Sequence, residues 1–142
     1  MSVGVLLITH PRVGDALRET AQGILKRLPL TVAAVSPGED ETPEETRGRI
    51  ESLVDGIDDD DGILILTDAF GATPANIAVA VGRGRGYPVI AGVNLPMLLR
   101  VLNYPQQSME SLAKTALSAA HNGILQATTP AIDHHEANHG VG

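Results

Sequence analysis

Two apolar stretches decide the fold of this chain, GVLLITH at residues 4–10 and GILILTD at residues 62–68. Each is a continuous run of Val, Leu and Ile, and each ends at a titratable side chain, His10 or Asp68. Runs of this length and composition predict strands that are buried on both faces of a parallel sheet. Ligands of such sheets bind beyond the carboxyl ends of the strands. We therefore expect His10 and Asp68 to meet at that edge.

The rest of the chain alternates between helical and strand patterns, with turn-forming residues between them. The expected strands are residues 4–9, 30–35, 62–67, 87–93 and 124–128, and the expected helices are residues 13–28, 43–57, 74–81, 96–102 and 109–122. This alternation implies right-handed crossovers and an open, doubly wound α/β sheet with helices on both faces. The polar strand ends converge if the four parallel strands lie in the order 2-1-3-4. The pattern alone does not fix that order.

Length and composition limit the class of function. A chain of 142 residues suits a single domain, which we place at residues 1–129, followed by a polar tail over residues 130–142 that we expect to be disordered. The net charge of −7 argues against a nucleic acid or an anionic membrane as partner. The absence of cysteine excludes disulfides and thiolate catalysis. No apolar stretch approaches the ~20 residues of a membrane-spanning helix, and no signal peptide is evident, so we expect a cytoplasmic protein.

Three polar segments attract attention, and we interpret none of them as a ligand site. The acidic run at residues 58–61 lies between a helix end and a buried strand, which favours a solvated connector. The glycine and arginine run at residues 82–86 follows a helix and precedes a strand, the reverse of a phosphate-binding loop. The tail contains three histidines between residues 133 and 139, but their spacing fixes no geometry. We expect no metal site.

His10 and Asp68 together predict a histidine nucleophile. A carboxylate that accepts a hydrogen bond from Nδ1–H fixes the tautomer and leaves the Nε2 lone pair free. After Asp68 the chain turns into a helix, with Thr73 expected as its N-cap and Pro74 as its first residue. Backbone N–H groups at the positive end of a helix favour a phosphoryl group. The candidate catalytic residues are His10 and Asp68, the candidate phosphoryl-binding residues are Phe70, Gly71, Ala72 and Thr73, and the candidate supporting residues are Thr9, Asn76 and Asn94.

Each of these residues also has a structural interpretation. A histidine after a strand is often a surface residue, and an aspartate there can cap the next turn. Phe70 is either a lid on the histidine or a core contact, and Asn76 and Asn94 can cap helices or close loops. The occurrence of both strand-end residues, followed by a glycine-containing turn, favours the functional interpretation.

Three motifs, in order, resemble the enzyme IIA domain of the mannose family of the bacterial phosphoenolpyruvate-dependent sugar phosphotransferase system. They are TH at residues 9–10, TDAFGATPAN at residues 67–76 and VIAGVNLPML at residues 89–98, and the resemblance runs from about residue 3 to residue 128. It implies that the phosphocarrier protein HPr phosphorylates His10, which then passes the group to an enzyme IIB partner. Asp68 would orient the ring, and residues 70–73 would hold the phosphoryl group. No cofactor is implied.

The resemblance also implies a four-stranded sheet in the order 2-1-3-4, completed by a C-terminal strand that is exchanged between the two subunits of a homodimer. Residues 124–128 match that fifth strand and have no evident partner within the chain. The sequence departs from the family at Pro11, where relatives often carry a small residue, and at Phe70, where some carry tryptophan. Neither change removes a reacting group.

Two other functions are considered. We expect no attached IIB domain, so the alternative is a stand-alone regulatory phosphoprotein that reports the phosphorylation state of the relay to a target. An aspartyl-phosphate receiver is disfavoured because receivers need acidic residues after the first strand, where this chain has His10 and Pro11.

Overall fold

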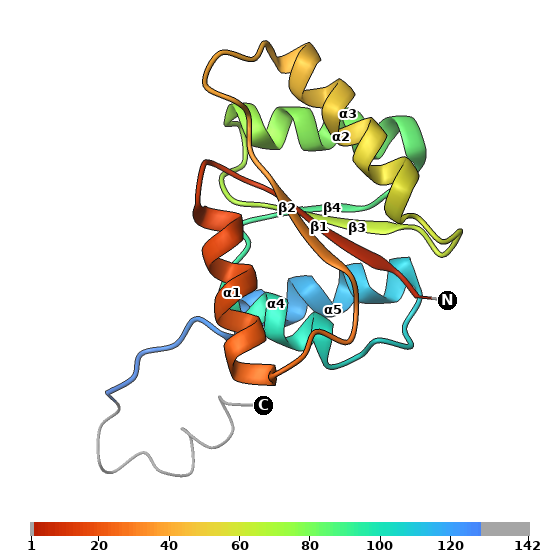
Figure 1. Cartoon of the computed structure of the whole chain (residues 1–142). Helices are drawn as coiled ribbons and strands as arrows, with labels where there is room; N and C mark the ends of the chain where they lie inside the picture. The colour runs from red at the N-terminus through yellow and green to blue at the C-terminus, as the bar shows by residue number, and fades with distance from the viewer. Residues whose placement is uncertain (1, 129–142) are drawn as a thin grey trace.

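The computed structural model of the protein describes residues 2–128 (Figure 1). The predicted polar tail lies outside these residues. The elements, in chain order, are β1 (Gly4–Ile8), α1 (Val13–Leu25), β2 (Val32–Val35), α2 (Pro43–Ile57), β3 (Ile63–Thr67), α3 (Thr73–Arg85), β4 (Val89–Ala91), α4 (Leu95–Leu102) and α5 (Met109–Asn122). Strands and helices alternate as far as β4, as the sequence predicts, and α4 and α5 follow.

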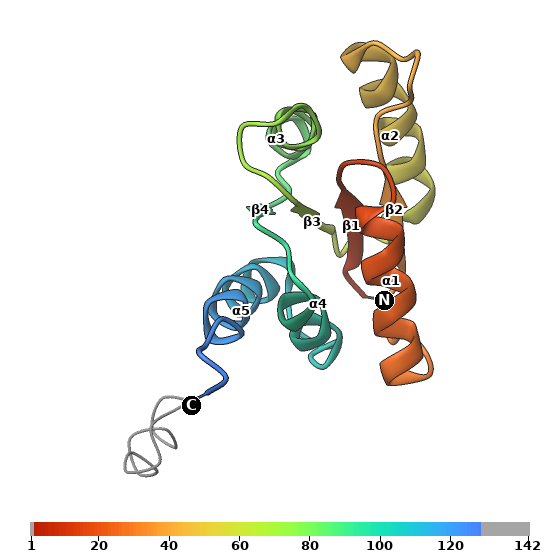
Figure 2. The same ribbon diagram turned by 90° about the vertical axis from the view of Figure 1, so that its left-hand side faces the viewer.

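The four strands form one parallel sheet in the order β2-β1-β3-β4, which confirms the predicted order. The central strands, β1 and β3, pair in a register that places Ile8 beside Thr67, so both strands end at the same level. Helices α2 and α3 cover one face of the sheet, and α1, α4 and α5 cover the other (Figure 1 and Figure 2). The crossovers after β1 and β3 therefore leave on opposite faces, which makes this point a topological switch point.

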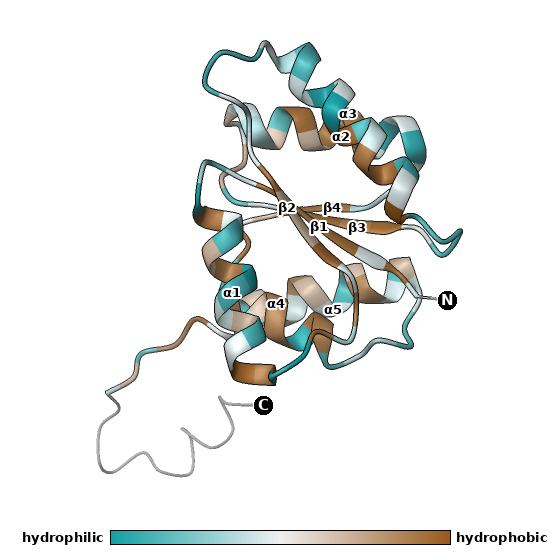
Figure 3. Ribbon diagram, in the orientation of Figure 1, coloured by the Kyte–Doolittle hydropathy of each residue, from teal (hydrophilic) through white to brown (hydrophobic). Residues whose placement is uncertain are grey.

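Both faces of the sheet carry an aliphatic core, which explains why β1 and β3 are apolar throughout rather than alternating. Leu7 and Leu66 belong to the core beneath α1, α4 and α5, whereas Leu6 and Ile8 belong to the core beneath α2 and α3. All four are fully buried. The apolar strands run through the middle of the molecule in Figure 3. Since burial of each such side chain contributes about 1.5–3 kcal/mol, the two central strands anchor the fold.

The prediction that residues 82–86 form a connector is wrong, because α3 continues to Arg85. The Arg85 guanidinium forms ion pairs with two carboxylates of α2, those of Glu51 and Asp55, the latter at 2.8 Å. Gly86 then ends the helix with φ at +73°, a left-handed conformation that glycine adopts without strain. Ion pairs with a neighbouring helix thus extend a segment whose glycines, taken alone, favour a loop.

Three other elements, α1, β2 and β4, are shorter than predicted. Helix α1 ends at Leu25 rather than at residue 28, and β2 begins at Val32 rather than at residue 30. Strand β4 covers only Val89–Ala91, because it is an edge strand that pairs with β3 alone. Strand ends are set by where a neighbour offers hydrogen bonds, which local sequence does not report.

The predicted fifth strand, residues 124–128, forms no strand in this single chain. It follows α5 as an extended and exposed segment, with Ile124 at 75% and Leu125 at 62% exposure. A strand needs a neighbouring strand to satisfy its backbone groups, and none within residues 2–128 pairs with this one. Exchange of the segment between subunits stays a prediction.

Across residues 2–128, no helix has the length and apolar character needed to cross a membrane. In the same part of the chain, no three His, Cys, Asp or Glu side chains gather in a way that could hold a metal ion. The three histidines of the tail lie outside the described residues. The first aspartate of the acidic run, Asp58, has a structural role, since it accepts hydrogen bonds from the N–H groups of Asp60 and Gly62 and from the Tyr87 hydroxyl.

Candidate functional site

The segment between β1 and α1 carries His10 and is held by the hydroxyl of Thr9. Thr9 Oγ1 accepts a hydrogen bond from the N–H of Gly14 at 2.9 Å and donates one to the carbonyl of His10 at 2.8 Å. Thr9 is buried, so water does not compete for these bonds. Arg12, just before α1, adopts φ of +74°, which is costly for a residue with a side chain. These contacts fix the shape of the loop and the position of His10.

The structure brings the two strand-end residues together. His10 Nδ1 lies 2.7 Å from Asp68 Oδ2, and the backbone N–H of His10 donates to the same oxygen at 3.0 Å. The other oxygen, Oδ1, accepts from the N–H of Ala69 at 2.9 Å. One carboxylate therefore holds both the backbone and the ring of His10, although the two residues are 58 positions apart in the sequence.

The contacts of Asp68 decide which nitrogen of His10 is free. Burial raises the pKa of Asp68, but the hydrogen bonds from the His10 N–H, the His10 ring and the Ala69 N–H outweigh burial, so the net effect is a lowered pKa. An ionised carboxylate only accepts hydrogen bonds, so in the neutral ring Nδ1 carries the hydrogen and Nε2 keeps its lone pair. The His10 side chain is 50% exposed and that of Asp68 only 16%. The ring edge that points away from Asp68 is thus free to act as a nucleophile.

The turn after β3 leads into an uncapped helix. The prediction that Thr73 is the N-cap of α3 is wrong, because Thr73 is the first residue of the helix and Ala72 is its N-cap. No side chain within residues 2–128 forms a capping hydrogen bond at this end. The helix starts one residue earlier than expected because the carbonyl of Ala72 already accepts from the N–H of Asn76 at 3.0 Å. Gly71 has φ of +90°, which permits the tight turn before the helix. The first N–H groups of α3 thus have no side-chain partner and are suited to an anion.

The structure also shows the surroundings of Phe70, Asn76 and Asn94, the other candidate residues. Phe70 is 86% exposed, which excludes a core contact. Asn76 lies in the first turn of α3 and its amide donates to the carbonyl of Gly71 at 3.4 Å. Asn94 caps α4, because its Oδ1 accepts from the N–H of Met97, and its Nδ2 donates to the carbonyl of Ala120 in α5; a supporting role at the site stays a prediction.

Two further features of the site were not recognised in the sequence. Gly14 lets α1 approach β1, since a Cβ there would lie 3.1 Å from Thr9 Oγ1 and 3.2 Å from Leu7 Cβ. The segment after β4 supports Asp68, because the N–H of Gly92 donates to the Asp68 carbonyl at 2.9 Å. The sequence signal for the close approach at Gly14 is an isolated glycine within an apolar helix pattern. The local sequence contains no signal for the hydrogen bond between Gly92 and Asp68.

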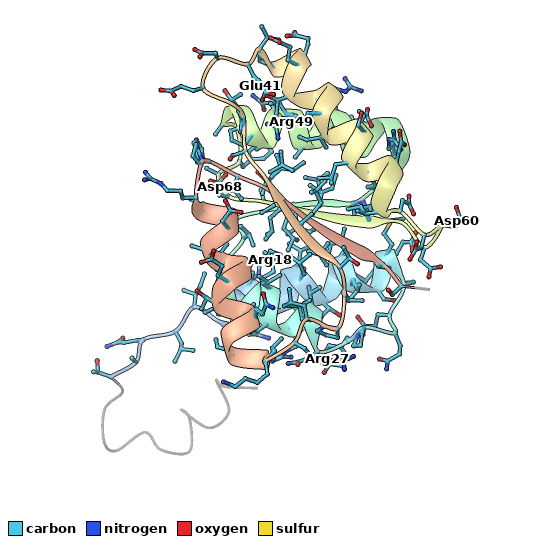
Figure 4. All side chains as sticks on the ribbon, in the orientation of Figure 1. Arg18, Arg27, Glu41, Arg49, Asp60 and Asp68 are labelled. Carbon is cyan, nitrogen blue, oxygen red and sulfur yellow. The ribbon has the colours of Figure 1, made fainter. Side chains whose placement is uncertain are left out.

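The loop between β2 and α2 flanks the site and is held by an ion pair. Figure 4 labels Glu41 and Arg49 at the end of the molecule that carries Asp68, and Asp60 at the opposite edge. Glu41 accepts two hydrogen bonds from Arg49, one from the hydroxyl of Thr46 and one from the N–H of Gly38. These bonds, that from Arg49 first, lower the pKa of Glu41 to about 2.

This lowered pKa predicts a dependence of stability on pH. A carboxylate whose pKa is lower in the folded state stabilises the fold above its ordinary value of 4.5, and loses that effect as the pH falls toward 2. We expect Glu41→Gln to have a lower free energy of unfolding than the wild type at pH 7, and the difference to disappear near pH 2. Urea unfolding at a series of pH values measures the difference in the free energy of unfolding between the variant and the wild type. Glu39→Gln in the same loop is the control, and an equal, pH-independent loss in both variants would contradict the assignment.

Comparisons with known proteins agree with this geometry. A family model described as PTS system fructose IIA component (EIIA-man) matches residues 4–117. The mannose-specific EIIAB component of the same system from Escherichia coli (strain K12) is 28% identical over 129 residues, an alignment that covers 87% of this chain and 39% of that protein. The chain therefore spans less than half the length of this relative.

Two solved structures share the fold. The mannose/sorbose specific IIA subunit from Enterococcus faecalis superposes with a TM-score of 0.78 at 20% identity, covering 92% of this chain and 98% of that one. The phosphotransferase system component EIIA from Streptococcus agalactiae gives a TM-score of 0.76 at 21% identity, covering 87% and 96% of the two chains.

Proposed function

Because the chain belongs to the EIIA-man family of IIA components of the sugar phosphotransferase system, we propose that it is a phosphohistidine carrier with His10 as the phosphoryl acceptor. The observation that carries this proposal is the 2.7 Å contact between His10 Nδ1 and Asp68 Oδ2. In the neutral ring this contact directs the lone pair to Nε2. The His10 side chain is half exposed, and the N-terminus of α3 at the same edge of the sheet has no side-chain cap. A nucleophile and an anion-binding group thus lie at the same edge of the sheet.

The proposed reaction is a transfer between two histidines. His10 Nε2 forms a bond to the phosphorus of a donor phosphohistidine while the nitrogen–phosphorus bond of the donor breaks. If the donor ring is protonated on its other nitrogen, it leaves as a neutral imidazole, and the positive charge passes to the His10 ring. Asp68 stabilises that charge through Nδ1–H. N–H groups of residues 70, 71 and 73 at the N-terminus of α3 face the charge on the phosphoryl oxygens, whereas the N–H of Ala72 already donates to the carbonyl of Ala69.

The donor we propose is HPr, and the acceptor is an enzyme IIB domain. The name of the Escherichia coli relative combines IIA and IIB components, which supports a IIB acceptor. A regulatory target in place of IIB is the alternative. Mixing the phosphorylated protein with a IIB domain separates the two, because only a relay component passes on its label.

The test of the carrier function is direct. The protein is incubated with labelled phosphoenolpyruvate, enzyme I and HPr, and we expect it to gain a phosphate that is labile in acid and stable in base. Omitting HPr provides the control and should prevent labelling. If the folded protein stays unlabelled while HPr is phosphorylated, the pair of His10 and Asp68 has a different role.

We also propose that residues 124–128 are exchanged between two subunits. The support is that Ile124 and Leu125 are exposed apolar residues in an extended segment without a strand partner in the described chain. Sedimentation equilibrium should give the mass of a dimer for the wild type and of a monomer for Leu125→Asp. Ile24→Asp, at a residue of α1 that is 53% exposed, is the matched control and should remain dimeric. A monomeric wild type would contradict exchange.

A further inference from the structure

A surface groove of about 280 Å³ lies between α2 and α3 and is not part of the reacting centre. We call it the α2–α3 groove. Its lining residues come from two helices, with Pro43, Glu44 and Arg47 on α2 and Asn76, Ile77 and Ala80 on α3. The two helices cover the same face of the sheet (Figure 2).

The groove is continuous with the proposed phosphoryl site. Thr73, the first residue of α3, also lines the groove, and Asn76 contributes to both regions. A protein that delivers a phosphoryl group to His10 must bring its own phosphorus against the ring and the N-terminus of α3. The surface of such a donor therefore covers the end of the groove that Thr73 forms.

The chemistry of the groove is apolar with a negative rim. Arg47 is engaged within the protein, because it lies 3.6 Å from a carboxylate oxygen of Glu51 and donates to the carbonyl of Ala80. Glu44 is exposed and forms no ion pair within residues 2–128, and the same holds for Glu39 and Asp40 in the preceding loop. Of the two charged residues that line the groove, Glu44 is therefore the one without an ion pair in the described part of the chain, and its charge is negative.

We propose that the α2–α3 groove is the docking surface for HPr, the proposed phosphoryl donor of His10. The partner packs an apolar side chain against Ala80, above the largely buried Ile77, and places basic side chains opposite Glu44. This inference rests on the proposed function and specifies which flank of the site the partner covers. Charge complementarity of this kind raises the association rate and weakens with salt.

Two variants and two matched controls test the docking surface. Ala80→Trp fills the groove, and Gln22→Trp adds the same side chain to an exposed position on α1. Glu44→Gln removes an exposed acid in the first turn of α2, and Glu110→Gln removes the equivalent acid in the first turn of α5. The phosphorylation rate is measured against HPr concentration, and also with phosphoramidate, a small molecule that phosphorylates histidine without a protein donor.

We expect Ala80→Trp to raise the KM for HPr about tenfold, and Glu44→Gln to raise it about two- to fivefold and to flatten its salt dependence. Both controls should behave as wild type, and all four variants should react with phosphoramidate at the wild-type rate. If phosphoramidate does not label His10 in the wild type, the proposed carrier function fails. If labelling is normal but Ala80→Trp and Gln22→Trp have the same KM, the docking inference fails.

A measurement on the unmodified protein gives an independent result. Unlabelled HPr is titrated into the ¹⁵N-labelled full chain, and amide chemical shifts are followed by NMR. We expect the shifts to concentrate at Glu44, Ile77 and Ala80, while Gln22 and Glu110 stay unperturbed. Shifts confined to α1 or α5 would overturn the inference even if Ala80→Trp failed to fold.

Discussion

His10→Ala will abolish phosphorylation of the protein by HPr. The variant lacks the nucleophile. Within residues 2–128, the side chain that is hydrogen-bonded to the His10 ring is the Asp68 carboxylate, and its oxygens also accept from the backbone N–H groups of residues 10 and 69. The acid-labile label should fall to background. Labelling with phosphoenolpyruvate, enzyme I and HPr, followed by separation of the proteins, measures it.

The matched control is His121→Ala, which removes an exposed histidine from the last turn of α5. It should be labelled like the wild type, with the same acid lability. Because His10 is half exposed and its ring contacts only Asp68 through a hydrogen bond, His10→Ala should keep the wild-type fold, and circular dichroism checks this. Persistent label in folded His10→Ala would place the phosphoryl group on another residue.

Asp68→Asn will slow phosphoryl transfer about 10²- to 10⁴-fold, the range seen when a carboxylate that orients a catalytic histidine is replaced. Either orientation of the amide is deleterious. If its oxygen replaces Oδ2, both bonds to His10 persist but the charge that stabilises the imidazolium is lost. If its nitrogen takes that place, Nδ1 becomes the acceptor and the proton moves to Nε2, which blocks the nucleophile. Single-turnover transfer from phosphorylated HPr measures the rate.

Asp61→Asn is the matched control for this experiment. Asp61 lies in the acidic run before β3, at the start of the same strand whose end carries Asp68, so the two substitutions change the net charge equally. It should transfer at the wild-type rate. An unchanged rate in Asp68→Asn would mean that the 2.7 Å contact positions the loop but does not assist the reaction.

The sequence predicted the class of fold and the strand ends that carry the site. The uninterrupted apolar runs before His10 and Asp68 indicate strands covered on both faces, and the structure has those strands at the centre of a parallel sheet. The strand order 2-1-3-4 did not follow from the pattern of apolar residues. It was the order under which the polar strand ends, His10 and Asp68, come together. The structure shows this order, because β1 pairs with both β2 and β3, and β3 also pairs with β4.

Residues whose role depends on neighbours from other segments were predicted less well. The sequence allowed Asn94 either a supporting role at the site or a capping role. The structure shows that it caps α4 and donates to the carbonyl of Ala120, a residue of a later helix. The glycine and arginine run after α3 was expected to be a connector, but Arg85 pairs with Glu51 and Asp55 on α2 and keeps the helix intact. Neither outcome is encoded in the residues next to these positions.

By itself, the sequence determined where the four strands of the sheet and the five helices lie, apart from their ends, and that a histidine and an aspartate follow two buried strands. Hydrophobic periodicity and turn chemistry act over a few neighbouring residues and so can be read locally. Only the tertiary structure decided the contact between Nδ1 and Oδ2, the uncapped start of α3 and the groove between α2 and α3. Each of these depends on how elements far apart in the chain pack on the sheet. The distances between their atoms follow from that packing and not from local preference.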